Sequence, residues 1–76
     1  MLNKVKEFRN NIGLTQKQLA ELVCVSQRTI ISLEKGQYKP SIILAYRLAC
    51  VFKTTIEDLF CLEENYRMEV SQFEDL

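Results

Sequence analysis

Residues 15–34 constrain the fold more than any other part of this sequence. Two runs with helical periodicity occupy this segment, and only residues 24–25 separate them. Thr15 and Gln18 have the spacing of a capping box, which would start the first helix, and Ser26 would cap the second. Because the connection is so short, the two helices must cross closely, with the start of the second exposed and its back face buried.

Helical spacing of apolar residues also predicts one helix before this segment and two after it. Gly13 would end the first, while Ser41 and Thr55 would cap the other two. The expected helices span roughly residues 2–11, 15–23, 26–34, 41–52 and 55–60. The inward residues of the first two would be Leu2, Val5, Phe8, Ile12, Leu19, Ala20, Leu22 and Val23. Since no strand signal precedes residue 61, the expected fold is all-α, with five helices in one compact domain over residues 1–60.

Residues 61–76 form an acidic extension that is too apolar to be only a solvated tail. Alternation at Tyr66, Met68 and Val70 favours a strand, whereas a spacing of three or four residues favours a helix. The helical stripe would consist of Leu62, Tyr66, Val70 and Phe73. The segment is too short for periodicity to decide between strand and helix. In either form it is a candidate dimerisation element.

Charge divides the chain into two parts, although the formal net charge is zero. Residues 1–53 carry nine Lys and Arg against three Glu, which gives a net charge of +6. Residues 54–76 carry one Arg against seven Asp and Glu, which gives −6. This asymmetry predicts a basic body that faces a polyanion and an acidic end that faces elsewhere.

Composition argues against an enzyme and against a metal site. The sequence has no histidine, no glycine-rich phosphate loop and no nucleophile paired with an activating base. Its cysteines, Cys24, Cys50 and Cys61, are widely and unequally spaced, so we expect reduced thiols in the cytoplasm and no metal or other cofactor. We expect Cys50 to be a small packing residue and Cys61 to lie in the core or at a subunit contact. No apolar run is long enough to span a membrane.

The stretch LTQKQLAELVCVSQRTIISLEKGQYKPS is similar to the lambda-repressor-like family of helix-turn-helix proteins, also called the Cro or XRE type. The shared pattern is the succession LTQ, LA, VS, TI, LE, G and PS, and the likeness extends from about Val5 to Phe60. The resemblance implies that the third helix enters the major groove of double-stranded DNA. It also implies an ion pair between Arg9 and Glu34 as part of the scaffold. Cys24 stands where the family most often has glycine, because the backbone turns left-handed there.

The outward arc of the third helix supplies the candidate base contacts. Ile30 and Leu33 would face inward, so the side chains on the opposite arc would face out. These outward residues are Gln27, Arg28, Ile31 and Ser32. The resemblance places all of them except Ile31 on the base-contacting positions of the family. Glutamine can bind adenine N6 and N7, arginine can bind guanine O6 and N7, and an exposed isoleucine suits the thymine methyl group.

Further residues would hold the DNA backbone and position the protein on it. At the start of the second helix, the backbone N–H of Gln16 suits a phosphate oxygen, and Lys17 would assist it. The candidate backbone contacts are Gln16, Lys17, Ser26, Thr29, Lys35, Tyr38 and Lys39.

One helix reads too few base pairs for specific binding, so we expect a homodimeric repressor on a pseudo-palindromic operator. The dimer interface is expected at the fifth helix and the segment after it, because their apolar residues exceed what five small helices can cover. The candidates are Leu59, Phe60, Leu62 and Tyr66. A protein-interaction module on the same fold, such as an antitoxin or a transcription adaptor, is the alternative, and a thiol-based sensor is a third possibility. No small-molecule ligand is expected.

Overall fold

The N-cap residues predicted from the sequence each start a helix in the computed structural model. The Thr15 hydroxyl accepts a hydrogen bond from the Gln18 backbone N–H at 3.0 Å, and the Gln18 side chain accepts one from the Thr15 N–H at 2.9 Å, which completes the capping box. Ser26, Ser41 and Thr55 cap the three helices that follow, each through a hydroxyl that accepts from the backbone N–H three residues later. Each cap satisfies backbone donors that the helix itself cannot pair.

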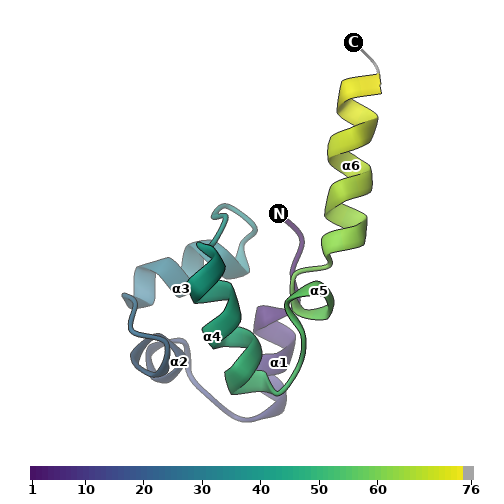
Figure 1. Ribbon diagram of the computed structural model, residues 1–76. Coiled ribbons are helices and arrows are strands. Elements are labelled where there is room, and N and C mark those ends of the chain that lie inside the picture. The colour runs from purple at the N-terminus through teal and green to yellow at the C-terminus, as the bar shows by residue number, and fades with distance from the viewer. Residues whose placement is uncertain (75–76) are drawn as a thin grey trace.

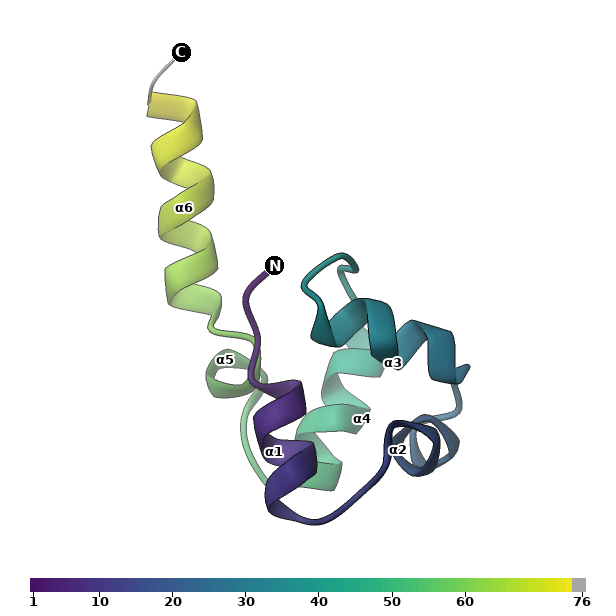
Figure 2. The same cartoon turned by 180° about the vertical axis from the view of Figure 1, so that it is seen from behind.

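The structure describes residues 1–74, with side chains as far as Ser71. The helices are α1 (Val5–Asn11), α2 (Gln16–Leu22), α3 (Gln27–Glu34), α4 (Ile42–Phe52), α5 (Ile56–Leu59) and α6 (Leu62–Glu74). Helices α1 to α5 gather into one body, and α6 projects away from it (Figures 1 and 2). The described residues thus form an all-helical fold of six helices, of which α6 lies in the C-terminal extension.

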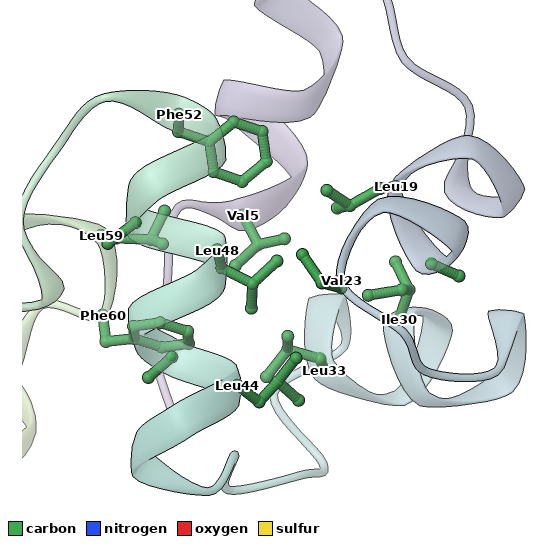
Figure 3. Packing of buried hydrophobic residues seen from close by; sticks show 13 residues of the cluster. Val5, Leu19, Val23, Ile30, Leu33, Leu44, Leu48, Phe52, Leu59 and Phe60 are labelled. Atoms are coloured by element: carbon green, nitrogen blue, oxygen red, sulfur yellow. The ribbon is translucent and has the colours of Figure 1, made fainter.

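The core lies between α4 and the helices that surround it. Figure 3 shows Leu48 of α4 at the centre of the apolar side chains from α1, α2 and α3. The α5 end of the core is closed by Leu59 and Phe60, which are completely buried. The fully buried large side chains are Phe60, Leu19, Ile30, Leu33, Leu48, Leu59, Val5 and Val23. This packing holds α2 and α3 in their crossing, because both contribute their inner faces to the same core.

The first helix begins later than the sequence predicted. Residues 1–4 form an extended arm, in which the Lys4 N–H donates to the Leu59 carbonyl at 2.8 Å and the Asn3 side chain accepts from the Val5 N–H at 3.1 Å. The helical spacing of Leu2 is therefore accidental, and its side chain is half exposed. Two further residues expected inside, Ile12 and Leu22, are also exposed, because each lies at the end of its helix where the core no longer covers it.

The segment after α5 is a helix, so the strand interpretation is wrong. Asn65 anchors the base of α6: its side-chain amide donates to the carbonyls of Phe60 at 2.7 Å and Leu2 at 2.9 Å. Its side-chain oxygen accepts from the Leu2 N–H at 2.9 Å. The side chain of Phe73, the last residue of the expected stripe, lies outside the described part. Within residues 1–74, no helix is both long and apolar enough to cross a membrane.

Candidate nucleic-acid interface

Helix α3 separates its buried side from its exposed side as the sequence predicted. Ile30 and Leu33 are completely buried against the core. On the opposite arc, the side chains of Gln27 and Arg28 are exposed, and those of Ile31 and Ser32 are half-buried. These four residues together line one shallow concavity on the surface. The arrangement brings an amide, a guanidinium, an apolar group and a hydroxyl onto one face.

The start of α3 is fixed by local hydrogen bonds. The Ser26 hydroxyl accepts from the Thr29 N–H at 3.2 Å and lies 3.0 Å from the Thr29 hydroxyl. Ser26 is exposed and Thr29 is half-buried beside it. The two predicted backbone contacts therefore also hold the first turn of the helix that carries the base-contacting candidates.

Glu34 ties α1, α2 and α3 together. Arg9 donates to it through Nε at 2.7 Å and through a terminal nitrogen at 3.2 Å, so the ion pair that the resemblance implied is present. The Gln16 amide also donates to Glu34, at 3.1 Å, which the sequence analysis missed. The third Arg9 nitrogen donates to the Leu14 carbonyl at 2.8 Å. The Arg9 side chain is 10% exposed and that of Glu34 is 4% exposed, which makes them scaffold and not surface.

The hydrogen bond that Arg9 donates to Glu34 raises the pKa of the Arg9 guanidinium above its ordinary value, although burial alone would lower it. Arg9 therefore stays charged inside the protein and is unavailable to DNA. At the start of α2, the Gln16 side chain is hydrogen-bonded to Glu34, so the backbone N–H of Gln16 is the group that remains a candidate for a phosphate contact. Lys17, next to it, is exposed.

The loop between α3 and α4 carries the remaining backbone-contact candidates. Lys35, Tyr38 and Lys39 are all exposed. The loop is fixed at Gly36, whose carbonyl accepts from the Met1 amino group at 2.7 Å. Gly36 has φ +74°, and a Cβ there would lie 3.1 Å from the Met1 carbonyl oxygen, so glycine is needed for this close approach. Lys39 Nζ lies 3.2 Å from Glu69 Oε1 of α6, in an exposed ion pair.

Comparison with known proteins bears on this arrangement directly. A family model described as helix-turn-helix matches residues 5–59, which covers the capped α2–α3 pair and the helices that hold it. The chain belongs to the helix-turn-helix family of DNA-binding transcriptional regulators of the Cro and XRE type. Family and relatives are named as regulators and not as enzymes.

Relatives of this helix-turn-helix protein occur in archaea and bacteria. An HTH-type transcriptional regulator of Methanothermobacter thermautotrophicus is 50% identical over 66 residues, which is 86% of this chain and 96% of that protein. One from Archaeoglobus fulgidus is 48% identical over 64 residues, 84% of this chain and 91% of that protein. The regulator YgzD of Bacillus subtilis is 45% identical over 64 residues, 84% of this chain and 97% of that protein.

Two solved structures share the fold. The restriction-modification controller protein C.AhdI from Aeromonas hydrophila has a TM-score of 0.68 at 28% identity, over 75% of this chain and 86% of that one. The clp gene regulator ClgR from Corynebacterium glutamicum also has a TM-score of 0.68, at 24% identity, over 93% of this chain and 74% of that one. The second likeness concerns the fold alone.

The expected dimer residues of the helix-turn-helix protein lie in two different environments. Leu59 and Phe60 have no exposed surface and belong to the core of the single chain, so their assignment to a subunit interface is wrong. Leu62 and Tyr66 are exposed on α6. The sequence analysis missed Ile42, Ile43 and Tyr46, which are exposed on α4. The sequence did contain a signal for their exposure, because none of these three residues falls on the inward stripe of α4. That stripe consists of Leu44, Ala45, Leu48, Ala49 and Phe52.

The cysteines of the helix-turn-helix protein are free thiols. Cys24 is exposed and has φ +60°, which is the left-handed conformation expected in the α2–α3 turn. Cys50 is exposed on α4, so the prediction that it packs inside is wrong. Cys61 is half-buried between α5 and α6, also with a positive φ of 48°.

Proposed function

We propose that this protein binds a pseudo-palindromic DNA operator as a homodimer and represses transcription by occupying it. The outward arc of α3 carries this proposal. Gln27, Arg28, Ile31 and Ser32 share one concavity, while the inner face of the same helix is completely buried. A helix held this rigidly can present its side chains to base edges with little loss of conformational freedom on binding.

The side chains of this arc have the chemistry for reading the major groove. Arg28 would bind O6 and N7 of a guanine, and Gln27 would bind N6 and N7 of an adenine. Ile31 would contact a thymine methyl group, and Ser32 tolerates several bases. Each good bidentate pair contributes roughly 1–3 kcal/mol of discrimination.

Contacts to phosphate would fix the register of the helix in the groove. The candidates around α3 are Gln16, through its backbone, and Lys17, Ser26, Thr29, Lys35, Tyr38 and Lys39. Their distribution supports the proposal. They come from the start of α2, the start of α3 and the α3–α4 loop, on either side of the outward arc of α3. A second copy would double the contacts and give half-sites about 34 Å apart.

Selection of bound sequences from a random pool of double-stranded DNA tests the proposal. We expect an inverted repeat with half-sites separated by one helical turn, and a logarithm of affinity that falls linearly with the logarithm of salt concentration. Enrichment of no sequence, together with no DNA binding at about 50 mM salt, would contradict the proposal and favour a protein-interaction module.

A further inference from the structure

Helix α6 contacts the rest of the protein at its base and again one turn further along. At the base, the Asn65 side chain is hydrogen-bonded to Leu2 and Phe60. One turn later, Glu69 Oε1 lies 3.2 Å from Nζ of Lys39 in the α3–α4 loop. In both views the N-terminal arm lies between that loop and α6 (Figures 1 and 2). The second contact therefore joins α6 to a loop that carries candidate contacts to the DNA backbone.

The arm, the α3–α4 loop and α6 together line a concavity on the surface. Its charged side chains are those of Lys35, Lys39 and Glu69. Both lysines are exposed beyond the end of α3, where they are candidates for contacts to phosphate. Of the two, Lys39 is the one that pairs with a carboxylate in the described part of the chain. The concavity thus holds a candidate DNA contact together with an acid that neutralises it.

A phosphate and the Glu69 carboxylate exclude each other at Lys39. A phosphate oxygen bound to the Lys39 ammonium group would lie about 2.8 Å from Nζ. It would then lie within about 6 Å of the carboxylate, which is itself 3.2 Å from Nζ. Like charges at this separation repel each other, and the repulsion opposes the gain from the new contact. The carboxylate therefore has to leave Nζ when a phosphate binds there.

We propose that Glu69 competes with DNA phosphate for Lys39, so that this ion pair weakens DNA binding and couples it to the position of α6. The inference rests on the proposed function for the contact between Lys39 and the DNA backbone. By linkage, DNA that binds Lys39 releases α6 at Glu69, and the ion pair lowers the affinity for DNA by the same factor. Asn65 would hold the base of α6 in both states.

The exposure of the ion pair limits the size of the effect. The Lys39 side chain is 76% exposed and that of Glu69 is 56% exposed, so water competes for both charges. Exposed ion pairs shift an equilibrium by up to about fivefold. The contact is short compared with the screening length of about 8 Å at 0.15 M salt, so the effect should persist at that concentration. A competition of this strength adjusts the affinity for DNA and does not abolish binding.

Substitutions that remove single charges from the full chain test the competition at 0.15 M salt, on a duplex that carries the selected site. Glu69→Gln should raise the affinity about two- to fivefold in the parent chain and leave it unchanged in a chain that already carries Lys39→Gln. The matched control is Glu64→Gln, which removes the same charge from an exposed position at the base of the same helix and should change neither affinity. An equal gain from Glu69→Gln in both backgrounds would show a general effect of charge and overturn the proposal.

Hydrogen exchange in the absence of DNA tests the ion pair by itself. Lys39→Gln removes the second anchor of α6, so exchange of the backbone N–H groups of residues 68–70 should rise about two- to fivefold. Lys35→Gln is the matched control, because it removes a charge from the same concavity but not from the ion pair, and it should leave this exchange unchanged. Exchange in the Lys39→Gln chain equal to that in the parent chain would overturn the proposal.

The two measurements distinguish failure of this inference from failure of the proposed function. A parent chain that binds its selected DNA but gains no affinity from Glu69→Gln would overturn the competition and leave the DNA-binding function intact. Unchanged affinity in the Lys39→Gln chain would do the same. A parent chain that binds no DNA would contradict the proposed function and the competition together, whatever the exchange in α6 shows.

Discussion

Cys24 combines an ordinary side chain with a backbone conformation that usually belongs to glycine. Its φ of +60° brings Cβ close to the following carbonyl oxygen, which costs on the order of 1 kcal/mol. Cys24→Gly removes this strain but adds backbone entropy to the unfolded chain. We therefore expect the free energy of unfolding, measured with urea, to stay equal or to rise by up to about 1 kcal/mol. Cys24→Ala, which keeps Cβ, should bring no such gain, and a clear loss with alanine as well as with glycine would show that the thiol itself stabilises the turn.

Arg28 and Lys35 should differ in what they contribute to DNA binding. Arg28 lies on the outward arc of α3, and Lys35 is exposed just after the helix ends. Arg28→Ala should cost about 1–3 kcal/mol on the selected site and relax preference at one base position. Lys35→Ala should weaken all sequences alike and reduce the salt slope by about one. Binding constants for the selected site and for its single-base variants distinguish these two roles. If both substitutions weaken binding to all sequences equally, the assignment of α3 to base contacts is wrong.

At the scale of the helices, the ion pair of Arg9 and Glu34 should stabilise the arrangement of α1, α2 and α3. Glu34→Ala leaves the Arg9 guanidinium buried without its partner and removes the acceptor of Gln16. Loss of one member of a buried pair costs about 3–5 kcal/mol, which is a large part of the stability of a domain of this size. Urea unfolding should show this loss, whereas Glu21→Ala on the exposed face of α2 should change stability by less than about 0.5 kcal/mol. Equal effects of the two substitutions would show that Glu34 is not a structural link.

The attachment of α6 should depend on Asn65. Its side chain makes hydrogen bonds to Leu2, Phe60 and Cys61, so one carboxamide joins the N-terminal arm, the end of α5 and α6. Asn65→Ala should increase hydrogen exchange in α6 and in residues 1–4 by tenfold or more, while exchange in α2 and α3 stays unchanged. The control is Asn10→Ala, on the exposed side of α1. Unaltered exchange in α6 would mean that apolar contacts alone hold this helix.

The helices that sequence reasoning predicted correctly are those set by local chemistry. Each helix cap depends on a neighbour within three residues, so its pattern can be recognised in the sequence. These caps are Thr15, Ser26, Ser41 and Thr55. The extended arm of residues 1–4 depends on partners thirty or more residues away, and periodicity carries no information about them. For the same reason, the sequence could not show whether Leu59 and Phe60 lie in the core of the chain or at a subunit interface. Both readings require an apolar residue, and only the packing of the chain distinguishes them.

At the scale of the whole molecule, the charge division of the sequence becomes a division in space. The molecule measures 42 × 23 × 20 Å, and α6 rises from the body on the side away from α3 (Figures 1 and 2). The basic residues of the chain lie mostly in the body, while Glu63, Glu64 and Glu69 lie on α6. This separation allows the basic surface to attract DNA without direct opposition from Glu63 and Glu64 at the base of α6, whereas Glu69 is paired with Lys39.

This geometry predicts that Glu63 and Glu64, at the base of α6, affect DNA association only at low salt. The screening length is about 30 Å at 0.01 M salt and about 8 Å at 0.15 M, so the charges of these two residues act on DNA across the body in the first condition and not in the second. The double substitution Glu63→Gln with Glu64→Gln should raise the association rate constant severalfold at 0.01 M and leave it unchanged at 0.15 M, as measured by stopped-flow fluorescence. Lys17→Gln, at the exposed start of α2, should lower the rate in both conditions, because its charge would lie next to a phosphate. A gain of equal size at both salt concentrations would place the base of α6 beside the DNA and contradict the assignment of α3 as the reading face.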